Sequence, residues 1–77
     1  MTDDGLDYPA VLPLVRQQLQ MSQEDLAREI GVSFNTVNRW EKGKVKPSKL
    51  AKNQLSYFLR RMTTEGRLKL PKKFMIW

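Results

Sequence analysis

Neither cysteine nor histidine occurs in this chain of 77 residues, and that absence restricts how the chain can be stabilised. A chain of this length forms one domain with a modest core, which usually needs compact helix packing, a metal, disulfides or a partner subunit. A disulfide framework, a thiolate nucleophile and the usual Cys/His zinc site are excluded. The eight acidic residues show no recognisable ligand spacing. We therefore expect no metal and no cofactor.

Charge is distributed unevenly along the chain. Residues 1–38 hold six acids and two bases, a net charge of −4, whereas residues 39–77 hold twelve bases and two acids, a net charge of +10. A one-sided basic surface attracts polyanions, of which nucleic acid is the commonest. An anionic membrane is the rival partner, and lysines that merely face solvent are the third explanation.

No segment has the pattern of a signal peptide or a membrane span. Residues 1–7 are acidic, and the apolar stretch that follows is short and interrupted by Pro9 and Pro13. We expect a cytoplasmic protein that binds neither a membrane nor a small-molecule substrate.

The first predicted helix lies within residues 9–19. Apolar residues recur there with helical spacing, at Val11, Leu12, Val15 and Leu19. Proline is tolerated only in the first turn of a helix, so Pro13 favours a start near Leu12 or Pro13.

Capping residues predict the next two helices. Ser22 opens one of them, with Asp25 placed to complete a capping box, and Gly31 ends it where a left-handed residue is needed. Ser33 caps the following helix, which Gly43 ends.

Ser48 caps a fourth predicted helix, over residues 49–62, and Gly66 ends the regular part. Its apolar stripe is Ala51, Leu55, Phe58, Leu59 and Met62. The chain then divides into a flexible acidic N-terminus (1–8), a helical domain (9–65) and a basic and apolar tail (66–77). The expected fold is an all-α bundle of four to five helices.

Residues 23–42 have the spacing of a helix-turn-helix. Such a motif needs a small residue where its helices touch, a turn residue between them, and apolar residues that hold the second helix on the first. Ala27, Gly31, Val37 and Trp40 meet these needs, and neither helix contains proline.

The outward face of the second of these helices carries amide and cationic groups. A helical wheel places Asn35, Asn38, Arg39 and Lys42 on the side opposite Val37 and Trp40, with Phe34 at the boundary. Asn pairs bidentately with adenine and Arg with guanine, so this face suits the edges of bases.

Residues from about 16 to 59 resemble the lambda Cro/repressor type of helix-turn-helix domain, also called the XRE family. The resemblance implies a lambda-repressor-like bundle that binds double-stranded DNA in the major groove. The matching residues, in order and without a gap, are Arg16, Ser22-Gln23-Glu24-Asp25-Leu26-Ala27, Ile30-Gly31-Val32-Ser33, Thr36-Val37 and Trp40-Glu41-Lys42-Gly43.

The resemblance also implies roles for single residues. Phe34, Asn35 and Arg39 match base-contacting positions, whereas Thr36 and Asn38 match positions at a phosphate or the groove wall. Because the wheel places Asn38 with the base-contacting residues, we expect it among them. Phe34 departs from the family, in which this position is often polar, and packing on a neighbouring loop is its alternative role.

Further positions match contacts outside the base edges. Gln23 matches a residue that binds a phosphate and braces the recognition helix, and Lys42, Lys44 and Lys46 match contacts to the DNA backbone. Arg16 and Glu41 match a structural ion pair, and a buried Glu41 needs such a partner. The expected backbone contacts are thus Gln23, Thr36, Lys42, Lys44 and Lys46.

These features predict a transcriptional regulator that binds double-stranded DNA as a homodimer and is not an enzyme, since no catalytic constellation is present. A DNA-binding antitoxin or the DNA-targeting module of a toxin–antitoxin or restriction–modification system is the first alternative. A protein-interaction module that uses the apolar end of the tail, residues 74–77, is the second. That end could pack on its own domain, on a second subunit or on another protein. Of these three, we favour the second subunit, that is, self-association.

Overall fold

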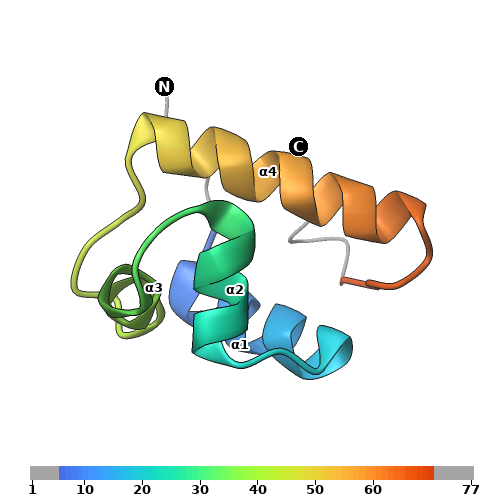
Figure 1. The fold of residues 1–77 in the computed structure, drawn as a ribbon, viewed down its shortest axis with the longest axis horizontal. Coiled ribbons are helices and arrows are strands. Elements are labelled where there is room, and N and C mark those ends of the chain that lie inside the picture. The colour runs from blue at the N-terminus through green and yellow to red at the C-terminus, as the bar shows by residue number, and fades with distance from the viewer. Residues whose placement is uncertain (1–5, 71–77) are drawn as a thin grey trace.

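Four α-helices and no strand make up the regular structure of residues 6–70, which are the residues that the computed structural model describes. They are α1 (Tyr8–Leu19), α2 (Gln23–Ile30), α3 (Phe34–Glu41) and α4 (Lys49–Thr64). In Figure 1, α4 lies along one side of the molecule, while α3 is seen end-on, far from the last turns of α4. The all-α prediction is confirmed; the predictions for residues 1–5 and 71–77 lie outside the described residues.

Serine side chains begin three of the four helices, as predicted. The hydroxyl oxygens of Ser22, Ser33 and Ser48 each accept a hydrogen bond from the backbone N–H three residues later, at 3.0–3.2 Å. Such a bond satisfies one of the backbone donors that the start of a helix leaves free. Gly31, at φ +88°, ends α2 in the left-handed region that glycine enters without strain.

Helix α1 begins earlier than the sequence indicated. The expectation of a start near Leu12 or Pro13 is wrong, because the helix runs from Tyr8 with Pro9 in its first turn and Pro13 inside it. Pro13 lacks the N–H that would bond the carbonyl of Pro9, so α1 forms without one of its internal hydrogen bonds. The ring of Tyr8 is buried, and its packing holds this first turn on the core.

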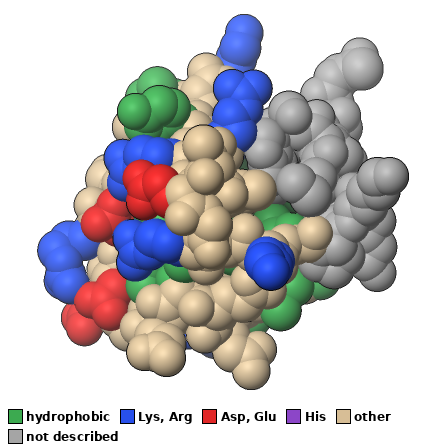
Figure 2. Space-filling view, turned by 90° about the vertical axis from the view of Figure 1, so that its right-hand side faces the viewer, with side chains coloured by type: hydrophobic (Ala, Val, Ile, Leu, Met, Phe, Trp, Pro, Cys, Tyr) green, Lys and Arg blue, Asp and Glu red, His purple; other side chains and the backbone are tan. Residues whose placement is uncertain are grey.

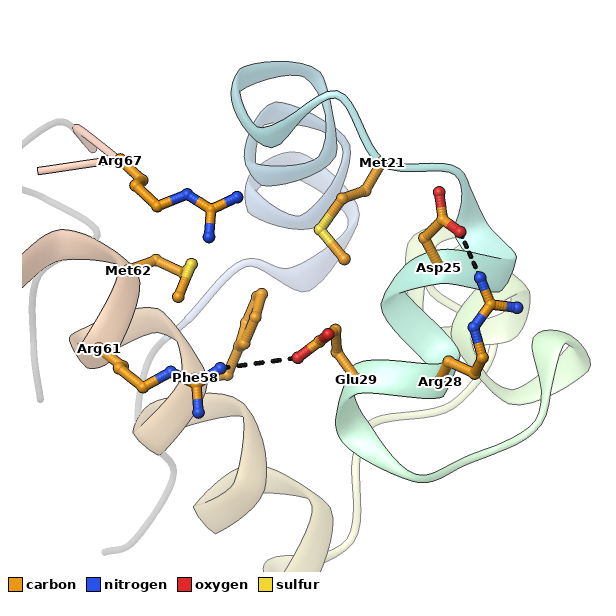
Figure 3. Close-up of a pocket in the computed structure, with 8 residues that line it drawn as sticks. All are labelled: Met21, Asp25, Arg28, Glu29, Phe58, Arg61, Met62 and Arg67. Carbon is orange, nitrogen blue, oxygen red and sulfur yellow. Dashed lines mark hydrogen bonds and ion pairs between the residues drawn. The ribbon is translucent and has the colours of Figure 1, made fainter. Parts of the chain in front are cut away.

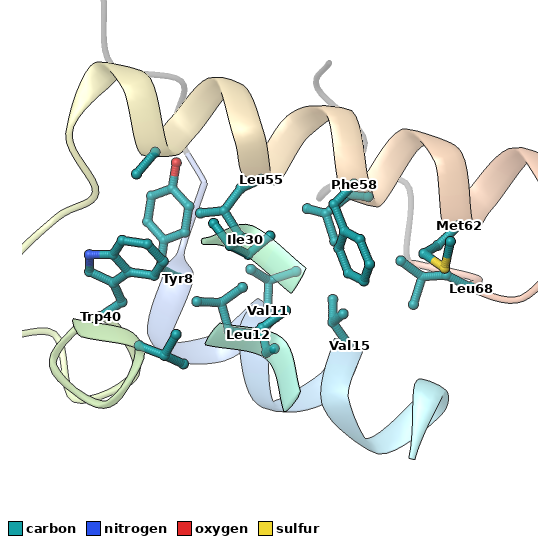
Figure 4. Packing of buried hydrophobic residues seen from close by; sticks show 14 of the residues in the cluster. Tyr8, Val11, Leu12, Val15, Ile30, Trp40, Leu55, Phe58, Met62 and Leu68 are labelled. Carbon is teal, nitrogen blue, oxygen red and sulfur yellow. The ribbon is translucent and has the colours of Figure 1, made fainter. Parts of the chain in front are cut away.

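One apolar core joins all four helices. Helix α1 contributes Val11, Leu12 and Val15, and α4 contributes its whole predicted stripe, as Figure 4 shows for most of these side chains. Leu68 and Leu70, beyond α4, are also buried. The packed unit therefore extends past residues 9–65 at both ends, from Tyr8 to Leu70. Among the described residues no helix has the length and apolar character needed to cross a bilayer.

Candidate nucleic-acid interface

Helix α3 is held on α2 by the residues that the motif requires. Ala27 is buried where the two helices meet, and its carbonyl accepts from the backbone N–H groups of Gly31 and Val32, at 2.8 and 3.0 Å. Val37 and Trp40 are buried on the inner side of α3. The packing of these side chains turns the opposite side of α3 outward.

The outward side of α3 exposes amide, aromatic and cationic groups without an acid. Asn35 and Arg39 are exposed, and 46% of the surface of Phe34 is accessible. That exposure leaves the Phe34 ring available for contact, for example with a thymine methyl. The acid of α3, Glu41, points away from this side, with its side chain 6% exposed.

Glu41 forms a two-point ion pair with α1. Nε of Arg16 lies 2.7 Å from Oε2 of Glu41, and Nη2 lies 2.9 Å from Oε1. The hydrogen bond to Glu41 raises the pKa of Arg16, burial opposes this, and the nearby negative charge adds to the rise. The predicted ion pair is present, and it ties the end of α3 to α1.

Gln23 links this ion pair to the outward side of α3. Its Nε2 donates to Oε1 of Glu41 at 3.0 Å, and its Oε1 accepts from Nδ2 of Asn38 at 3.1 Å. The bracing expected of Gln23 thus appears as two hydrogen bonds from α2 to α3. No sequence pattern predicts the bond to Asn38, because it depends on the distance between two helices.

Thr36 and the lysines lie at the edges of this surface. The hydroxyl groups of Thr36 and Ser33 are 2.9 Å apart, so half-buried Thr36 supports the start of α3. Exposed cationic side chains follow α3 into the segment before α4, at Lys42, Lys44 and Lys46. The predicted base-contacting residues therefore all lie on α3. The predicted backbone contacts lie in its first turn, in the segment after it, or, for Gln23, on α2 and hydrogen-bonded to α3.

The side of the molecule at the end of α4 has a different charge pattern. Figure 2 shows acidic and basic side chains next to one another there. A cavity of about 280 Å³ also opens between α2 and α4, and no residue of α3 lines it. Its two acids each pair with an arginine, Asp25 with Arg28 and Glu29 with Arg61 (Figure 3). Because these pairs offset most of the charge, the cavity offers less to a polyanion than the α3 side.

No group of three or more acidic side chains within residues 6–70 is arranged to hold a metal ion. The remaining chemistry of the α3 side is hydrogen bonding, cationic attraction and contact with an aromatic ring. These are the interactions by which proteins bind base edges and phosphates.

Comparison with known proteins identifies the motif. Residues 14–50 match a family model described as Helix-turn-helix, whereas curated proteins and solved structures gave no significant match. The match covers α2, α3 and the turn between them, together with Arg16 and Glu41. The chain carries a DNA-binding helix-turn-helix domain of the XRE family, with the all-α lambda-repressor-like fold.

Proposed function

We propose that this protein is a transcriptional regulator that binds specific sequences of double-stranded DNA, with α3 in the major groove. The observation that carries the proposal is the acid-free outward side of α3, which exposes Asn35, Arg39 and Phe34 next to the half-buried Asn38. Arg suits the two acceptors of guanine, Asn suits adenine, and an aromatic ring suits the thymine methyl.

Phosphate contacts would fix how α3 sits in the groove. Lys42, Lys44 and Lys46 follow α3 directly, where the DNA strands beside the groove would pass. Thr36 lies in the first turn of α3, and Gln23 lies in the first turn of α2, hydrogen-bonded to α3. Contacts to phosphates supply affinity and register, while contacts to bases supply specificity. In this proposal α3 supplies the specificity, and the segment that follows it supplies most of the contacts to phosphates.

The protein acts in the cytoplasm as a homodimer, with one α3 for each half of an inverted repeat. Two-fold symmetry then places the half-sites about one helical turn of DNA apart. Leu68 and Leu70 are buried in the core of their own domain. Within the tail, residues 66–77, we propose that the part beyond Leu70 forms the dimer contact.

Selection of binding sites from a random duplex library, followed by titration with salt, tests the proposal. We expect one enriched inverted motif for the wild type. Arg39→Ala should remove the preference at one position of each half-site, at a cost of about 1–3 kcal/mol for the cognate site.

Lys44→Ala is the matched variant for phosphate contacts. It should weaken binding to all sequences alike and lower the salt dependence by about one counterion. An unenriched library, together with an Arg39→Ala variant that loses the same affinity for every duplex, would exclude sequence-specific binding.

A further inference from the structure

The hydrogen bonds that start at Glu41 fix the orientation of two amide groups. A carboxylate only accepts hydrogen bonds, so the end of the Gln23 amide that faces Glu41 must be its NH₂ group. Oε1 of Gln23 then faces α3, where it accepts from Asn38. The group that Asn38 turns toward Gln23 must in turn be its NH₂ group.

Arg16 fixes the direction in which these hydrogen bonds run, from donor to acceptor. Its guanidinium holds both oxygens of Glu41, at 2.7 and 2.9 Å, and the carboxylate is nearly buried. Because both carboxylate oxygens accept hydrogen bonds from Arg16, Glu41 faces Gln23 as an acceptor. We call Arg16, Glu41, Gln23 and Asn38 the polar network.

The network leaves Asn38 with a defined set of unused groups. Within residues 6–70, Oδ1 of Asn38 accepts from no other group, and one of its two N–H bonds is likewise unused. Asn38 is half-buried at the edge of the outward side of α3, on which Asn35 and Arg39 are exposed. One acceptor and one donor on the same amide are therefore available to a ligand on that side.

We propose that the polar network makes Asn38 selective for adenine, with Gln23 as the positioning residue that sets its orientation. The proposal rests on the proposed function, since it assumes that α3 enters the major groove. Adenine offers a donor and an acceptor there, which match Oδ1 and the unused N–H of Asn38. Guanine offers two acceptors and thymine one, so each would face the carbonyl oxygen of Asn38 unfavourably, while cytosine offers a donor alone.

A variant that reverses the orientation of the Asn38 amide tests the proposal. Lysine only donates hydrogen bonds, so in Gln23→Lys the amine would bond both Glu41 and Oδ1 of Asn38. Asn38 would then turn its NH₂ group outward, which suits the two acceptors of guanine. The position to probe is the one at which Asn38→Ala abolishes the base preference. Affinities are measured for duplexes that carry each of the four bases at that position.

We expect the wild type to prefer adenine over guanine at that position, and Gln23→Lys to lower this affinity ratio by about tenfold or to invert it. The ratio is independent of the added positive charge, which changes affinity for all duplexes alike. Gln54→Lys, on the exposed surface of α4, is the control for charge, and Asn53→Ala is the control for loss of an amide. Neither control should change the preference.

The outcomes separate this inference from the proposed function. A wild type that prefers no sequence overturns both. A specific wild type whose preferences survive Asn38→Ala at every position overturns the inference alone, as does a Gln23→Lys variant that keeps the adenine preference. If thermal unfolding shows that Gln23→Lys does not fold, Gln23→Ala replaces it, because loss of the Gln23 acceptor frees the amide and should bring the ratio toward one.

Discussion

Glu41 is a charged side chain held almost entirely inside a very small domain. Its side chain is 6% exposed, and its carboxylate accepts three hydrogen bonds, two from Arg16 and one from Gln23. Removal of a carboxylate from water costs several kcal/mol unless partners of good geometry replace the water. The bidentate arginine and the amide provide that replacement, so Glu41 is a structural group and not a surface charge.

Arg16→Met should destabilise the domain, because it removes the charged partner of Glu41 but keeps a similar side-chain length. We expect the free energy of unfolding to fall by about 2–3 kcal/mol, measured by urea unfolding. Arg28→Met is the control, since the side chains of its ion pair with Asp25 are 75% and 42% exposed. Its loss should stay below about 1 kcal/mol, and equal losses in the two variants would contradict the structural role of the Arg16 pair.

Single residues differ in how far the sequence could predict them. The Arg16–Glu41 pair followed from the resemblance and from the place of Glu41 on the helical wheel, and the structure contains it. The bond between Gln23 and Asn38 could not be predicted, because it depends on how closely α2 approaches α3. The DNA contacts of the α3 residues stay predictions until a complex is measured.

At the level of elements, the start of α2 is a reciprocal capping box. Oγ of Ser22 accepts from the backbone N–H of Asp25, and the Asp25 carboxylate accepts from the backbone N–H of Ser22, both at 3.0 Å. The bond from the Ser22 backbone lowers the pKa of Asp25, the Ser22 side chain adds to this, desolvation opposes it, and Arg28 contributes least. Helix α2 is thus best capped when Asp25 is ionised.

Asp25→Asn should remove a pH-dependent part of the stability. Because folding lowers the pKa of Asp25, the stabilisation is complete above the ordinary pKa of aspartate and disappears as the pH falls through the folded value. The free energies of unfolding of wild type and variant should therefore differ at neutral pH and converge in acid. Glu24→Gln, in the same turn but outside the capping box, controls for the helix dipole and should show a smaller difference. A constant difference across pH would contradict this role of Asp25.

Helix boundaries were predictable where local chemistry sets them. Ser22, Ser33 and Ser48 bond backbone groups only three residues away, so their positions in the sequence suffice. The start of α1 was mispredicted because a tertiary contact decides it. Burial of Tyr8 stabilises a turn that the proline pattern alone disfavours.

For the whole molecule, the segment after α4 returns to α1. Nε2 of Gln18 donates to the carbonyl of Lys69 at 2.6 Å, and Oε1 of Gln18 accepts from the backbone N–H of Lys69 at 2.8 Å. Leu68 and Leu70, on either side of Lys69, are buried in the core. The sequence did not predict this packing, because two leucines separated by one lysine carry no helical period.

Gln18→Ala should loosen this attachment without unfolding the helices. Loss of two exposed hydrogen bonds should cost about 1 kcal/mol, and the backbone amide of Lys69 should exchange faster with solvent. Hydrogen exchange followed by NMR measures this. Gln17→Ala, one residue earlier and also exposed, is the control and should leave the exchange of Lys69 unchanged. Equal protection of Lys69 in both variants would show that the leucines alone hold the segment.

Truncation at two positions separates the fold from the proposed dimer. Removal of residues 71–77 keeps Leu68 and Leu70, so the domain should fold and bind a half-site. The truncated protein should no longer dimerise, and it should therefore lose much of its affinity for the full inverted repeat. Removal of residues 67–77 also takes both leucines from the core and should cost several kcal/mol, roughly the scale of large-to-small changes at buried leucines. Light scattering at tens of micromolar protein, thermal unfolding and titration with half and full sites distinguish these effects. A full chain that is monomeric at that concentration, and whose affinity for the full site survives removal of residues 71–77, would require the dimer proposal to be abandoned while the role of the two leucines stands.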